Sequence, residues 1–122
     1  MRYHWVSCAR RIAALGALLM LLPAAGLGRE AEYEVAVETE VMVPMRDGVR
    51  LATDIYRPAK DGAPIAGRLP AILARLPYNK DGQKSTGRYY AARGYVFVAQ
   101  DTRGRYKSEG VWHMLSDDGP DG

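Results

Sequence analysis

The 122-residue chain contains a single cysteine, Cys8, and this scarcity excludes several kinds of chemistry. One thiol cannot form a disulfide within the chain, and it cannot build a metal centre of several cysteine ligands. Cys8 also lies within the first 28 residues, which have the features of a targeting segment. The remaining part therefore has no thiolate nucleophile, and its stability must rest on an ordinary apolar core.

An excess of positive charge is also missing outside the first 28 residues. The formal net charge is +3, and Arg2, Arg10 and Arg11 account for all of it, because no acidic residue precedes Arg29. The rest of the chain carries 14 basic and 14 acidic residues. Binding to nucleic acid depends on a concentrated positive surface, so nucleic acid is not an expected partner.

Long hydrophobic runs are absent as well, since the longest candidate, residues 12–22, has eleven residues. A membrane-spanning helix needs about 20 apolar residues. Arg10-Arg11 before this run and small residues after Pro23 are typical of a signal peptide. We therefore expect residues 1–28 to be removed after Gly26 or Gly28, leaving no stable membrane span and a periplasmic or secreted protein. A retained anchor is the alternative, and general secretion fits better than twin-arginine export.

Two segments with strand periodicity begin the remaining chain. Residues 35–43 alternate in part, and residues 49–56 place Leu51, Thr53 and Ile55 on one face. Asp47-Gly48 between them is a strong hairpin signal, because glycine tolerates positive φ. We expect the second strand to end at residues 57–58, which include a proline, and residues 60–68 to form a surface loop.

A strand–helix–strand unit is predicted next. Residues 70–76 form a mostly apolar run, which is typical of a strand buried on both faces. Residues 83–93 can form a helix that ends at Gly94 in a left-handed cap, and residues 95–99 are again apolar. This order favours a parallel strand pair with a right-handed crossover. The predicted fold class is α/β, with an antiparallel hairpin leading into a mainly parallel sheet.

Polar residues follow both strands of this unit, where α/β sheets bind ligands. Tyr78 lies just past the first strand, and Pro77 fixes the direction in which the chain leaves it. The alternative interpretation is a loop tyrosine whose hydroxyl simply contacts water. After the second strand, Asp101 and Arg103 could pair, and Gly104 could make a sharp turn.

Three segments resemble one known family when they are taken together. VPMRDGVRLATDIYRP, LPAILARLPYNKDG and YYAARGYVFVAQDTRGRYKSEG look like the start of the cocaine esterase and X-Pro dipeptidyl-peptidase group, which includes α-amino acid ester hydrolases. The resemblance covers residues 41 to about 122. It implies an α/β-hydrolase fold and a serine hydrolase that cleaves a small ester or peptide substrate without a cofactor or metal.

The resemblance also implies a role for Tyr78. In this family the tyrosine of the Pro-Tyr motif donates its hydroxyl to the oxyanion of the tetrahedral intermediate. The second donor is the backbone N–H of the residue after the nucleophile. Asp101, Arg103 and Gly104 match the family's second motif, and we interpret them as residues that shape a loop.

The sequence lacks the motif that marks the serine nucleophile of an α/β-hydrolase. An α/β-hydrolase needs a G-x-S-x-G elbow followed by an acid and a histidine, and the sequence contains no such elbow. A Ser108–His113 pair is conceivable but lacks an orienting acid. We therefore expect residues 29–122 to be an inactive N-terminal fragment of a catalytic domain. The alternative is a non-catalytic exported β-rich binding module or an inactive truncated product. Residues 117–122, rich in aspartate, lack the spacing of a Ca²⁺ loop, and the oligomeric state cannot be predicted.

Overall fold

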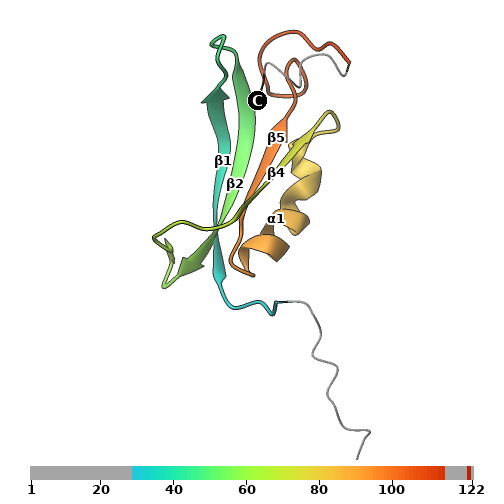
Figure 1. Ribbon diagram of the computed structural model, residues 1–122. Helices are drawn as coiled ribbons and strands as arrows, with labels where there is room; N and C mark the ends of the chain where they lie inside the picture. The colour runs from blue at the N-terminus through green and yellow to red at the C-terminus, as the bar shows by residue number, and fades with distance from the viewer. Residues whose placement is uncertain (1–28, 115–120, 122) are drawn as a thin grey trace, which may run out of the picture.

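The computed structural model describes residues 29–114 and 121, and its strands form one mixed sheet (Figure 1). The order across the sheet is β1-β2-β5-β4, and a short β3 pairs with β2. The elements are β1 (Glu34–Pro44), β2 (Arg50–Lys60), β3 (Ala63–Pro64), β4 (Ala71–Leu76), the 3-10 helix η1 (Lys80–Gln83), α1 (Lys84–Ala91) and β5 (Val96–Asp101).

The predicted hairpin is confirmed in β1 and β2, which pair antiparallel. Gly48 has a φ of 87°, and the Met45 N–H donates to the Val49 carbonyl at 2.8 Å to close the turn. The register shifts between Glu38 and Val41, which marks a bulge. Glu40 lies in this bulge with a φ of 59°, so its backbone leaves the regular strand geometry.

The expected end of the second strand at residues 57–58 is wrong, because β2 continues to Lys60. The carbonyl of Pro58 accepts from the Ile65 N–H at 2.9 Å, on the side of β3. The N and C=O of a strand residue point to the same side, so the missing N–H of Pro58 also faces β3. The ladder with β1 is therefore not interrupted, and the proline is tolerated. Within the predicted loop of residues 60–68, β3 adds two paired residues.

The strand–helix–strand unit is confirmed. β4 and β5 pair in parallel, from Ala71 opposite Val96 to Leu76 opposite Asp101, and α1 connects them. The helix is shorter than residues 83–93, since Gln83 belongs to η1. Gly94 has a φ of 88°, and its N–H donates to the Ala91 carbonyl at 3.0 Å, as expected of a helix C-cap.

The core lies between the sheet and α1. It is built around Tyr56, Ala91, Phe97 and Ala99, all at most 2% exposed. Gly87 of α1 lies directly over the Tyr56 ring, because a Cβ at this position would be 2.5 Å from Tyr56 Cδ2. The helix therefore approaches the sheet closely.

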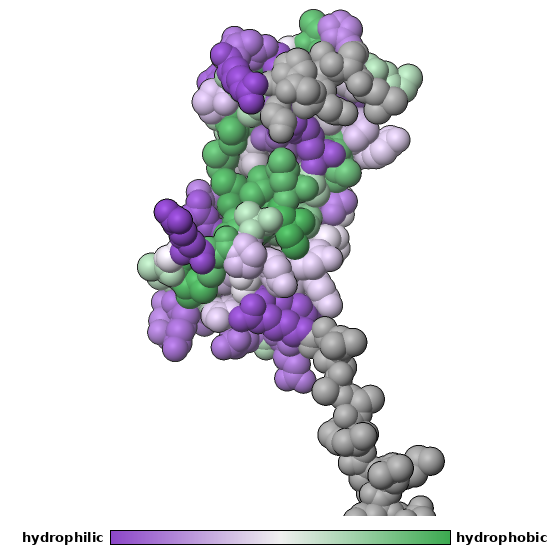
Figure 2. Space-filling model, in the orientation of Figure 1, coloured by the Kyte–Doolittle hydropathy of each residue, from purple (hydrophilic) through white to green (hydrophobic). Residues whose placement is uncertain are grey.

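Burial of β4 on both faces is not found among the described residues. Ile72 and Ala74 pack against the core, whereas Leu73 is 58% exposed. Figure 2 shows apolar surface over the middle of the sheet. The apolar run indicated the strand correctly, but among residues 29–114 and 121 only one face of β4 is covered by a helix.

Some expectations fall outside the described residues, namely the signal segment 1–28 with Cys8 and most of the aspartate-rich stretch 117–122. Within the described part of the chain, no helix is long and apolar enough to cross a membrane.

Candidate active site

Tyr78 lies just beyond the carboxyl end of β4, in the turn before η1. Its side chain is 80% exposed, and its hydroxyl makes no hydrogen bond to residues 29–114 or 121. A pocket of about 440 Å³ borders it. Pro77 and Tyr78 line this pocket from the β4 side, and Thr102, Arg103 and Arg105 line it from the β5 side. The structure therefore places Tyr78 at a pocket formed beyond two parallel strands, as the sequence predicted.

The turn that carries Tyr78 has an unusual backbone. Asn79 has a φ of 79°, a value that residues other than glycine seldom adopt. Its side-chain oxygen accepts the Asp81 N–H at 2.9 Å, which is the type of local bond that lets asparagine hold such a conformation. The tyrosine is thus followed at once by a residue whose unusual backbone conformation is held by its own side chain.

Lys80 lies within the fold although it is charged. Its side chain is 1% exposed, and its ammonium lies 2.7 Å from Glu40 Oε1 and 2.9 Å from Asp54 Oδ1. Burial by itself lowers the pKa of Lys80, but the hydrogen bonds with Glu40 and Asp54 outweigh it and raise the pKa above its usual value. Lys80 therefore stays protonated and anchors the turn instead of acting as a base.

Glu40 also binds a second cation, Lys107, which lies in the loop after β5. The ammonium of Lys107 lies 2.9 Å from the same Glu40 Oε1. Hydrogen bonds from Lys80 and Lys107 lower the pKa of Glu40, so it remains a carboxylate. The bulge in β1 places the Glu40 carboxylate beside these cations. The sequence pattern did not predict the ion pairs of Lys80 with Glu40 and Asp54, or that of Lys107 with Glu40.

Asp101 and Arg103 do not form the pair that their spacing allows. Arg103 Nη1 instead donates to Asp47 Oδ2 at 2.8 Å, and Arg103 Nε donates to Asp121 Oδ1 at 3.1 Å. These bonds raise the pKa of Arg103 further above its usual value. Asp101 is 1% exposed and accepts the Lys80 backbone N–H at 2.7 Å. Both residues shape the loops around the pocket, as the sequence predicted.

The sharp turn at Gly104 is confirmed by its φ of 64°. A Cβ there would lie 2.2 Å from the backbone N of Trp112, so no other residue fits without moving the chain. The close approach brings Trp112 to the pocket, where Arg105 stacks on its ring at 4.7 Å from the centroid.

Ser108 is not placed as a nucleophile. Its Oγ accepts the Ala52 N–H at 2.9 Å and donates to the Asp101 carbonyl at 2.8 Å. It therefore joins the loop after β5 to β2. His113 is a loop residue that lines the pocket. Among the described residues there is no group of three or more histidine, cysteine, aspartate or glutamate side chains that could hold a metal ion.

The described residues match the N-terminal part of an α/β-hydrolase fold: an antiparallel hairpin leads into a parallel strand–helix–strand unit, with a pocket beyond its strands. Comparison with known proteins gives the family. The family model for X-Pro dipeptidyl-peptidase (S15 family) matches residues 47–122, and the chain belongs to this family.

Relatives of known sequence or structure agree with this assignment. A cocaine esterase of Rhodococcus sp. (strain MB1 Bresler) is 43% identical over 98 residues, which cover 75% of this chain and 16% of that protein. A solved α-amino acid ester hydrolase is 31% identical with a TM-score of 0.53, covering 79% of this chain and 17% of the other. A CocE/NonD family hydrolase from Staphylococcus aureus is 27% identical with a TM-score of 0.54, covering 66% and 17%. The chain thus spans about a sixth of the length of these relatives.

Proposed function

We propose that this chain forms part of a longer serine hydrolase that cleaves ester or amide bonds through an acyl-enzyme, with Tyr78 as an oxyanion donor. One observation carries the proposal: an exposed tyrosine hydroxyl without a partner among the described residues borders the pocket beyond β4. A donor held ready in this way stabilises negative charge that develops only in the transition state. The family's serine nucleophile, acid and base are not recognisable in this sequence, which has no G-x-S-x-G elbow.

The substrate class follows from the names of the relatives. A cocaine esterase, an α-amino acid ester hydrolase and a family of X-Pro dipeptidyl-peptidases all act on acyl bonds. We therefore propose a small ester or an X-Pro-like peptide as the substrate of the whole protein. Acyl transfer to a serine requires no cofactor.

The test replaces Tyr78 by phenylalanine in the full-length hydrolase. Tyr78→Phe keeps the ring and removes the donor, so kcat should fall by about 10²–10³. KM should change far less, because the charge appears mainly in the transition state. Tyr106→Phe is a matched control, since Tyr106 is also exposed, at 54%, but does not line the pocket. With an activated ester and chemistry shown to be rate-limiting, a kcat within about threefold of wild type would overturn the proposal.

The 122-residue chain alone is proposed to be inactive, because it carries no complete set of catalytic groups. An assay of the purified chain with p-nitrophenyl acetate should match its heat-denatured control. Turnover above that control would show a nucleophile that lies outside a G-x-S-x-G motif.

Export is the remaining part of the proposal, and it rests on residues 1–28. The protein recovered from the periplasm or the medium should begin after Gly26 or Gly28, as determined by mass spectrometry of its N-terminal peptide. A protein that retains Met1 and fractionates with membranes would support the anchor instead.

A further inference from the structure

We propose that Asp101 is a positioning residue that fixes Tyr78 for catalysis, an inference that rests on the proposed role of Tyr78. The two residues do not bond to each other. Asp101 acts through the backbone of Lys80, whose N–H donates to Asp101 Oδ1 at 2.7 Å. Asp101 is 1% exposed and does not line the pocket, so it has no direct access to a substrate.

The turn that carries Tyr78 is held on both sides by the end of β5 and the segment that follows it. Before the tyrosine, the Leu76 carbonyl accepts the Thr102 N–H at 3.2 Å, and the Pro77 carbonyl accepts Arg105 Nε at 3.2 Å. After the tyrosine, the backbone N–H of Lys80 donates to Asp101 Oδ1. The backbone is therefore fixed at residues 76, 77 and 80, whereas the Tyr78 side chain is left without a described partner.

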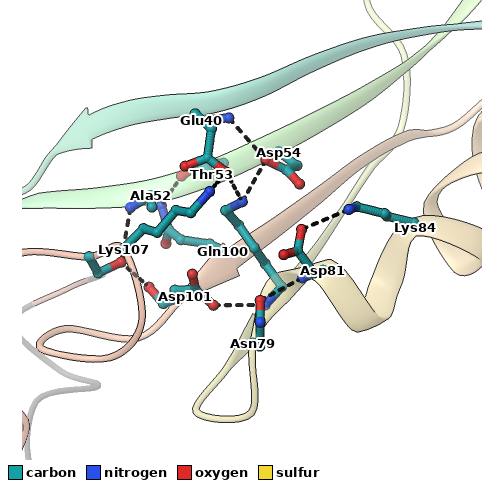
Figure 3. Close-up of polar contacts among 12 residues, drawn as sticks. Glu40, Ala52, Thr53, Asp54, Asn79, Asp81, Lys84, Gln100, Asp101 and Lys107 are labelled. Carbon is teal, nitrogen blue, oxygen red and sulfur yellow. Dashed lines mark hydrogen bonds and ion pairs between the residues drawn. The ribbon is translucent and has the colours of Figure 1, made fainter.

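The part of the turn after Tyr78 is also held by the side chain of Lys80. Its buried ammonium binds Glu40 of β1 and Asp54 of β2, at 2.7 and 2.9 Å. Figure 3 shows Glu40 and Asp54, which are also joined by the bond from the Glu40 N–H to Asp54 Oδ1. Lys80 thus ties the turn to the hairpin by its side chain and to β5 by its backbone. The left-handed Asn79 lies between this anchor and Tyr78, so little freedom remains to the backbone at the tyrosine.

A carboxylate is a costly choice for such a buried site if stability were its only purpose. Burial raises the pKa of Asp101, which is the sign of this cost. A charged acceptor does, however, make a shorter and stronger hydrogen bond than a neutral one. The Asp101 carboxylate therefore fixes the position of Lys80 more tightly, and with it the position of Tyr78. A displacement of about 1 Å at a catalytic group can lower a rate by about 10²-fold.

The experiment is a double-mutant cycle in the full-length hydrolase. Asp101→Ala is introduced into the wild-type enzyme and into the Tyr78→Phe enzyme. Asp101→Ala should lower kcat about 10–100-fold with KM changed less than about threefold. In the Tyr78→Phe background it should have no further effect on kcat, because the donor that it positions is already gone. Val37→Ala is the control: it removes packing from the core between the sheet and α1, away from the turn, and should leave kcat unchanged in both backgrounds.

A conservative variant covers the case in which Asp101→Ala does not fold. Asp101→Asn keeps an oxygen for the Lys80 N–H but makes a weaker, neutral bond. Its kcat should fall only about threefold, again only in the presence of Tyr78.

The outcomes separate the two proposals. Equal losses of kcat in both backgrounds would mean that Asp101 acts on the fold as a whole, and would overturn the positioning role alone. An Asp101→Ala or Asp101→Asn enzyme with the wild-type kcat would overturn it too. If Tyr78→Phe by itself keeps kcat, the oxyanion role fails, and the positioning role fails with it.

Discussion

Lys80 and Asp54 form an ion pair in which both side chains are 1% exposed, with 2.9 Å between the ammonium and Asp54 Oδ1. The same Asp54 oxygen accepts the backbone N–H of Glu40 at 3.0 Å. One carboxylate therefore holds both the bulge of β1 and the turn that follows Tyr78. The pair joins β2 to the turn after β4, although β5 lies between these two strands in the sheet.

Removing the cation of this pair should be costly. Lys80→Met keeps the length of the side chain but leaves Asp54 buried without its partner, so the free energy of unfolding should fall by about 3–5 kcal/mol. Lys107→Met is the matched control, because Lys107 binds the same Glu40 oxygen but is 60% exposed. It should cost at most about 1 kcal/mol. Urea unfolding measures both variants, and equal losses would contradict the view that burial makes the difference.

A methyl group at Gly87 should destabilise the protein although alanine favours helices. The new Cβ would lie 2.5 Å from the Tyr56 ring, and the close packing of α1 on β2 would have to open. Overpacking of this kind costs about 1–3 kcal/mol, which exceeds the gain of about 1 kcal/mol in helix propensity. Gly82→Ala is the comparison, since nothing lies within 4 Å of its Cβ position. Thermal unfolding should show a lower Tm for Gly87→Ala only; a Tm at or above wild type would mean that the ring moves aside freely.

Ser108→Ala should affect stability and leave catalysis intact. The change removes the acceptor of the buried Ala52 N–H and the donor to the Asp101 carbonyl, so a loss of about 1–3 kcal/mol in unfolding free energy is expected. The kcat of the full-length hydrolase should stay near wild type. Loss of a serine nucleophile would instead lower kcat by about 10⁶-fold. Ser85→Ala, at an exposed position of α1, should change neither quantity.

Features that depend on local chain geometry could be predicted from the sequence. The turn at Asp47-Gly48 and the cap at Gly94 need positive φ, which glycine supplies wherever it stands. The position of Tyr78 followed from an apolar strand ended by Pro77. Its catalytic role remains a prediction that comes from the family resemblance.

Features that depend on distant partners could not be predicted. The extent of β2 was missed because the effect of Pro58 depends on which neighbour its missing N–H faces. The burial of Lys80 depends on a bulge that turns Glu40 toward it, and apolar periodicity carries no sign of such a bulge. The spacing allows Arg103 to pair with Asp101, two residues away, but Arg103 binds Asp47 and Asp121, which the fold brings to it.

The contributions of Asp101 and Asp47 to the free energy of unfolding should change with pH in opposite directions. Burial raises the pKa of Asp101 above its ordinary value of 3.8, whereas the hydrogen bond with Arg103 lowers the pKa of Asp47 below the same value. A group that binds its proton more tightly in the folded state adds most stability at low pH and loses it as pH rises through the folded pKa. A group that binds its proton less tightly adds stability above its unfolded pKa and loses it as pH falls through the folded pKa.

Two variants separate these contributions, because asparagine does not titrate in this range. As pH rises from about 3.8 toward 6, the unfolding free energy of wild type should fall relative to Asp101→Asn. As pH falls from about 3.8 toward 2.5, the unfolding free energy of wild type should fall relative to Asp47→Asn. Urea unfolding at intervals of half a pH unit measures both differences. Parallel curves for wild type and Asp101→Asn would show that the Asp101 carboxyl titrates alike in the folded and unfolded states, against its burial between Leu76 and Lys80.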